Sequence, residues 1–99
     1  MTVSGFMTIW ALSIVNGIQS DVFSSRDFIW ALMTEHEREY IQLLNEDRSD
    51  HPIWNVHKQI GKYLADHAGK SLPIASFDVR ERSLSPLGNE SATMMWRKL

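Results

Sequence analysis

Residues 55–69, NVHKQIGKYLADHAG, decide the fold that this sequence predicts. At 100° per residue the stretch has one apolar face and an opposite face that carries Lys58 and Lys62. The apolar face contains Val56, Ile60, Tyr63, Leu64 and His67. Asn55 is a suitable N-cap, because its side-chain oxygen can accept from the free N–H groups of the first turn. Gly69 suits the left-handed position that follows a last helical turn. We therefore expect a helix over residues 55–68, with His67 as a core histidine that has a local partner.

After Gly69 the hydrophobic period changes from 3.6 residues to 2. Apolar and polar residues alternate over residues 72–80 and again over 92–97, which predicts two strands. The segment between them, residues 81–91, reads ERSLSPLGNES and contains the turn residues proline, glycine and asparagine. The C-terminal part is therefore predicted to be an antiparallel hairpin with a long tip.

Before the central stretch, the pattern predicts three further helices. The first covers residues 4–19, and its inner stripe contains Phe6, Trp10, Ile14 and Ile18, widened by Ile9 and Leu12. The second begins at Ser24, because Ser24 to Asp27 has the spacing of a capping box. Thr34 is the predicted cap of the third helix.

The third helix is expected to bury three apolar positions, Tyr40, Ile41 and Leu44. Residues 45–52, NEDRSDHP, follow as a polar loop that ends in proline. Ile53 and Trp54 precede the expected cap of the central helix, and we expect both to pack back onto it as a hydrophobic staple.

This order of elements predicts an α+β fold that is mostly helical. Three to four helices followed by a β-hairpin match a winged helix-turn-helix, formed as one domain by residues 1–99. In that architecture the helix before the hairpin enters the major groove of DNA and the hairpin contacts the backbone.

Composition and charge favour a small intracellular globular protein. Of the 99 residues, 43% are hydrophobic and 22% are charged, and there is no cysteine. Residues 1–50 have three basic residues against eight acidic, a net charge of −5, and residues 51–99 have seven against four, a net charge of +3. The apolar run over residues 6–18 is too short and too mixed for a membrane span. The difference in net charge between the two halves of the chain indicates one surface that suits a polyanion.

Residue patterns typical of catalysis, metals or cofactors are absent from the sequence. The four histidines, His36, His51, His57 and His67, are not at metal-ligand spacing, and no G-x-x-x-x-G-K-[ST] or G-x-S-x-G motif occurs. We therefore expect a binding module rather than an enzyme, with no cofactor, no metal and no catalytic residue.

Two classes of partner remain open from the residues alone. The first is nucleic acid, with DNA preferred. The residues expected to contact it are Asn55, His57, Lys58, Gln59, Lys62, Arg82, Arg97 and Lys98. The second is a protein bound by an adaptor or inhibitor module, for which Leu84 and Leu87 at the hairpin tip are the expected contacts. The sequence leaves the oligomeric state open.

Three segments resemble a known family. FSSRDFIWAL, HKQIGKYLADHAGK and the final MMWRKL resemble the small C-terminal winged-helix module of phage-type replicative helicase and primase proteins. The matching positions are Phe23, Ser25, Phe28, Leu32, Ile60, Gly61, Leu64, Gly69, Trp96 and Arg97. The resemblance implies a winged helix from a phage or mobile-element replication protein. In that family catalysis lies in other domains, so no helicase or ATPase activity is implied here.

Overall fold

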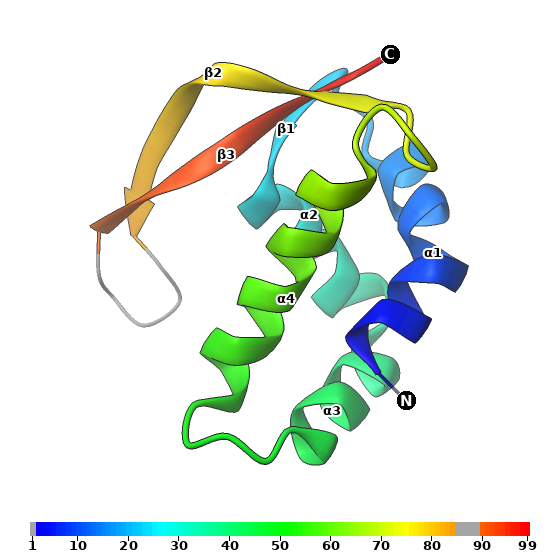
Figure 1. Cartoon of the computed structure of the whole chain (residues 1–99), viewed down its shortest axis with the longest axis vertical. Coiled ribbons are helices and arrows are strands. Elements are labelled where there is room, and N and C mark those ends of the chain that lie inside the picture. Colours follow the sequence, from blue (N-terminus) through cyan, green and yellow to red (C-terminus); the bar gives the residue numbers. More distant parts are fainter. Residues whose placement is uncertain (1, 85–89) are drawn as a thin grey trace.

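Four helices and one small antiparallel sheet make up the fold (Figure 1). The structure, a computed structural model, describes residues 2–84 and 90–99, and the side chains of residues 2–76 and 94–99. The elements are α1 (Val3–Gly17), β1 (Val22–Ser24), α2 (Ser25–Glu35), α3 (Glu37–Glu46), α4 (Pro52–His67), β2 (Ile74–Leu84) and β3 (Glu90–Lys98). The predicted α+β class, mostly helical with a C-terminal hairpin, is confirmed. The winged-helix assignment stays a prediction.

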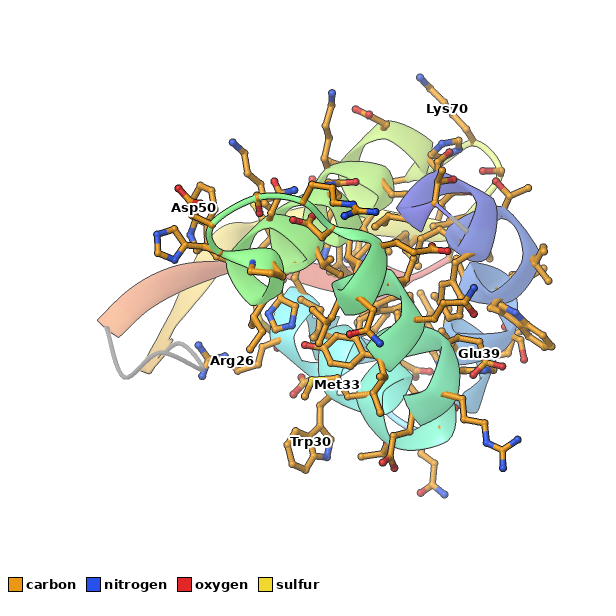
Figure 2. All side chains as sticks on the ribbon, turned by 90° about the horizontal axis from the view of Figure 1, so that it is seen from below. Arg26, Trp30, Met33, Glu39, Asp50 and Lys70 are labelled. Atoms are coloured by element: carbon orange, nitrogen blue, oxygen red, sulfur yellow. The ribbon has the colours of Figure 1, made fainter. Side chains whose placement is uncertain are left out.

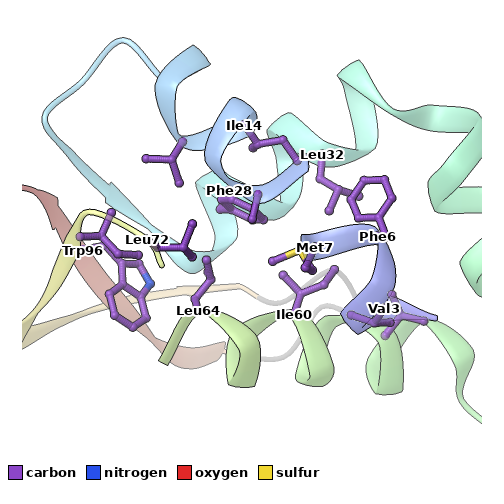
Figure 3. Packing of buried hydrophobic residues seen from close by; sticks show 14 of the residues in the cluster. Val3, Phe6, Met7, Ile14, Phe28, Leu32, Ile60, Leu64, Leu72 and Trp96 are labelled. Atoms are coloured by element: carbon purple, nitrogen blue, oxygen red, sulfur yellow. The ribbon is translucent and has the colours of Figure 1, made fainter. Parts of the chain in front are cut away.

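The helices and the sheet share one hydrophobic core. Figure 1 shows α4 in front of α2, with α1 on one side of α4 and the hairpin on the other. In Figure 3, Met7 of α1 and Ile60 of α4 point toward one another, and Trp96 of β3 lies beside Leu72. The indole Nε1–H of Trp96 donates a hydrogen bond of 2.8 Å to the hydroxyl of Ser25. The core therefore ties the last strand to the start of α2.

The capping box at the start of α2 is confirmed. The Ser24 hydroxyl accepts from the N–H of Asp27 at 3.0 Å, and the Asp27 carboxylate accepts from the N–H of Ser24 at 2.9 Å. The predicted cap at Thr34 is wrong, because α2 continues to Glu35 and the Thr34 hydroxyl donates to the carbonyl of Trp30. The third helix instead begins at Glu37, after His36, whose side chain makes no capping hydrogen bond.

Two helices bury faces that differ from the predicted ones. Ile9 and Leu12 of α1 are 68% and 47% exposed, so their predicted burial is wrong. The buried positions of α1 are Val3, Phe6, Met7, Ala11, Ile14 and Val15. In α3, Ile41 is also exposed, and Leu43 takes the buried position beside Tyr40. The exposed side of α1 combines Ile9 and Leu12 with small uncharged polar residues, so the hydrophobic period alone separated the two faces poorly.

The sheet contains one strand that the sequence pattern did not predict. β1 pairs antiparallel with β3, with Phe23 opposite Trp96, and β3 lies in the middle of the sheet. β2 and β3 are longer than predicted, so most of the expected loop over residues 81–91 belongs to them. Their register shifts between Ser76 and Arg80. Leu87 lies outside the described residues.

Candidate nucleic-acid interface

The basic helix begins three residues earlier than predicted. α4 starts at Pro52, a residue favoured at the first helical position because its missing N–H would be unsatisfied there anyway. Asn55 therefore lies inside the first turn, and its predicted role as N-cap is wrong. Its side-chain amide donates instead to the Asp47 carboxylate at 2.6 Å. Hydrogen bonds from Ser49 and then Asn55 hold the pKa of Asp47 below its ordinary value.

The exposed side of α4 presents one aromatic and two basic side chains in line. Trp54, Lys58 and Lys62 recur every four residues and lie opposite the buried Val56 and Ile60. We call this surface the α4 ridge, and it consists of Trp54, Lys58, Gly61, Lys62 and Ala65. None of these side chains is acidic, but Asp66, the next residue at the four-residue spacing, is exposed and lines one hollow together with Lys62.

Trp54 is not part of a hydrophobic staple, and that prediction is wrong. Trp54 is 55% exposed and Ile53 is 40% exposed. The ammonium of Lys58 lies 5.0 Å from the centroid of the Trp54 ring, within the range of a cation–π interaction. Gly61 lies one turn further on, and a Cβ added there would meet nothing within 4 Å. The ridge is thus low in its middle, and no described side chain fills the space next to Gly61.

A hollow lies on each side of the α4 ridge. One, of about 280 Å³, separates α4 from the start of α1 and is lined by Val3, Ser4, Gln59, Lys62, Tyr63, Asp66 and His67. The other, of about 360 Å³, lies between the end of α4 and the sheet and includes Ala65, Gly69 and Met94. Gln59 and Lys62, two of the predicted contact residues, therefore share one hollow.

His57 faces the protein rather than the ridge. Its Nε2 lies 2.8 Å from the hydroxyl of Tyr40 on α3. Burial, and then the positive charge of Arg26, lower the pKa of His57, and burial raises the pKa of Tyr40. Both shifts favour the neutral forms, so the hydrogen bond joins a neutral hydroxyl and a neutral imidazole. This bond joins α3 to α4 and occupies a side chain that was predicted to lie near base edges.

His67 has the local partner that was predicted, but it is half-buried and does not belong to the core as expected. Its ring stacks on Tyr63 with the centroids 3.9 Å apart, and its Nδ1 lies 2.8 Å from the hydroxyl of Ser71. Gly69 adopts φ 73°, in the left-handed region, so the predicted end of the helix is confirmed.

The two predicted contact residues of the hairpin whose side chains are described, Arg97 and Lys98, do not extend the α4 ridge. Arg97 is exposed, and strand alternation places it on the sheet face opposite to the buried Trp96. The ammonium of Lys98 donates to the carbonyl of Ile18 at the end of α1. The side chains of Arg82 and Leu84 lie outside the described residues. The structure brings together Lys58, Gln59 and Lys62, and the other predicted contacts lie elsewhere or are not described.

Neither a metal site nor a membrane-spanning helix is found among the described residues. Among the described residues, no group of three or more His, Asp or Glu side chains is arranged to hold a metal ion. None of the helices in residues 2–84 and 90–99 has the length and apolar character needed to cross a bilayer. Comparison with protein-family models, curated proteins and solved structures found no match to this chain.

The lowered pKa of His57 predicts that stability falls in mild acid. Below its unfolded pKa of about 6.5, the unfolded chain binds more protons at this site than the folded protein does. The free energy of unfolding should therefore rise with pH up to about 6.5. The stability contributed by neutral His57 is lost as the pH falls from about 6.5 toward the lowered pKa of the folded protein. Urea denaturation between about pH 5 and 7.5 measures this slope.

The matched variant for this prediction is His57→Gln, whose amide oxygen can still accept from Tyr40. This variant should flatten the slope, because the imidazole that titrates is gone. An equal slope in wild type and His57→Gln would show that His57 does not carry the pH dependence.

Proposed function

We propose that this protein binds nucleic acid, with DNA as the first candidate, through the α4 ridge. The observation that carries the proposal is the line of Trp54, Lys58 and Lys62 on the exposed side of α4. Two ammonium groups one turn apart suit the phosphates of a backbone, and an exposed indole suits a base or a sugar.

The topology adds support to this proposal. The basic helix directly precedes a two-stranded hairpin, and β1 completes a sheet in the order β1–β3–β2. A winged-helix architecture would use these elements in DNA binding. The resemblance to replication proteins of phages or mobile elements, and an intracellular location, are parts of the same proposal. An enzymatic activity is not part of it.

Fluorescence anisotropy tests the proposal directly. A labelled mixed-sequence DNA is titrated with protein, as a duplex and as a single strand, at low and moderate salt. We expect binding that weakens with salt, because each lysine–phosphate contact releases condensed counterions. Two such contacts give a slope of log affinity against log salt of roughly −1.4 to −1.8. Absence of binding to either DNA at low salt would refute the proposal.

A protein partner is the second candidate, and one observation favours it. α1 contains no charged residue, and two of its apolar residues, Ile9 and Leu12, are exposed. An exposed helix face usually carries charged or polar residues, and this one has only small uncharged polar residues beside its apolar pair. The hairpin-tip residues that were predicted for this role are not described by the structure, so α1 is now the better surface for it. The anisotropy titration separates the two candidates.

A further inference from the structure

We infer that Trp54 stacks on an unpaired base, so that the α4 ridge binds single-stranded nucleic acid more tightly than a duplex of the same sequence. This inference rests on the proposed function and specifies its ligand. The polar side chains of α4 that could contact base edges are largely engaged within the protein. Asn55 and His57, the residues best suited to read base edges, are hydrogen-bonded to Asp47 and Tyr40.

What remains on the ridge recognises features that all nucleotides share. Ammonium groups contact phosphates without regard to sequence. An indole contributes a flat π surface, on which any base can stack if it is not already stacked within a duplex. A surface of cations and one aromatic ring, with few groups for base edges, is suited to a single strand.

The spacing along α4 fits a strand that lies along the helix. Lys58 and Lys62 are four residues apart, which corresponds to about 6 Å of helix axis. One nucleotide of an extended strand covers such a distance. Trp54 lies one turn before Lys58, so a base stacked on its ring would place the next phosphates beside the two lysines. The small residues Gly61 and Ala65 let the backbone approach the helix closely.

The contact with Lys58 fixes the position of the Trp54 ring. With the ammonium 5.0 Å from its ring centroid, the ring is held by a cation–π interaction. More than half of the Trp54 side chain is nevertheless exposed. An apolar protein groove is a poorer occupant, because the rest of the ridge offers two charges and two small residues rather than further apolar side chains.

The test measures how binding depends on Trp54. A labelled strand of about 16 nucleotides, the upper end of known site sizes, and its duplex are titrated with wild type, Trp54→Ala and Trp54→Phe. Trp54→Ala should weaken single-strand binding roughly 5- to 100-fold and duplex binding much less, and Trp54→Phe should keep most of the affinity. Trp30→Ala, at an exposed tryptophan of α2, should change nothing.

The outcomes separate this inference from the proposed function. Salt-dependent binding that needs Lys58 and Lys62 but is unchanged in Trp54→Ala would overturn the inference alone, as would a preference for the duplex. Heparin is the control polyanion without bases, and equal loss of heparin binding in Trp54→Ala would also overturn it. If wild type binds neither DNA at low salt, both the inference and the proposed function fail.

Discussion

Trp96→Ala is expected to destabilise the domain by about 3–5 kcal/mol, a large part of the stability of a small domain. The side chain is only 1% exposed and packs at the end of the core. In the sheet, Trp96 of the middle strand lies opposite Phe23 of β1 and Ser76 of β2. Its removal leaves a cavity where β1, β3 and α2 meet, and the Ser25 hydroxyl loses its partner. Urea denaturation followed by far-ultraviolet circular dichroism measures the loss.

Three variants separate the causes of this destabilisation. Trp96→Phe keeps most of the ring and should cost less than Trp96→Ala. Ser25→Ala removes only the hydrogen-bond acceptor, and the buried indole N–H left without a partner should cost about 1–3 kcal/mol. Trp30→Ala removes a tryptophan that is 67% exposed and should change stability by no more than about 0.5 kcal/mol. Figure 2 shows the Trp30 side chain pointing away from the ribbon, on the opposite side of the molecule from Lys70. Equal stability of Trp96→Ala and Trp30→Ala would contradict the core described here.

Reversing both ridge charges, Lys58→Glu with Lys62→Glu, is expected to reduce affinity for DNA on the order of 100-fold at low salt. Both lysines are exposed, so the protein itself should stay folded. The change removes two phosphate contacts and places two carboxylates against the backbone. The salt dependence should nearly disappear together with the affinity, because no lysine of the ridge then displaces counterions.

Two controls make this result specific to the α4 ridge. Lys58→Arg with Lys62→Arg keeps the charge and should bind nearly as wild type does. Arg38→Glu changes the charge by the same amount per residue at an exposed position of α3, and should have little effect. If Arg38→Glu weakens binding as much as Lys62→Glu alone, net charge rather than the ridge determines affinity.

Features set by short-range interactions were predictable from the sequence. The capping box at Ser24 and the left-handed Gly69 depend on residues within four positions, and both are found. β1 was not predictable, because it has three residues and is held by β3, more than seventy positions later. The start of α4 could have been found from Pro52, which is as strong a signal as the asparagine on which the prediction relied.

The site was predictable in part, and the remainder depends on tertiary packing. The helical period placed Lys58 and Lys62 on the exposed side correctly. His57 was predicted to lie near base edges, but its ring is hydrogen-bonded to Tyr40. That contact forms only because α3 packs on α4, so the helical period could not reveal it. Trp54 was missed because a helix that begins at Asn55 leaves it outside. Because the helix begins at Pro52, Trp54 lies within it and shares the four-residue spacing of Lys58 and Lys62.

The four tryptophans occupy different surroundings, and this makes the chain its own spectroscopic reporter. Trp96 is buried and hydrogen-bonded, whereas Trp30 and Trp54 are largely exposed. Trp10 is half-buried, with its ring centroid 4.8 Å from that of His36. Intrinsic emission is therefore a sum of separable signals. A chain that keeps only Trp96 would shift to longer wavelength on unfolding, and one that keeps only Trp54 would be quenched by a stacked base, with no dye attached to either molecule.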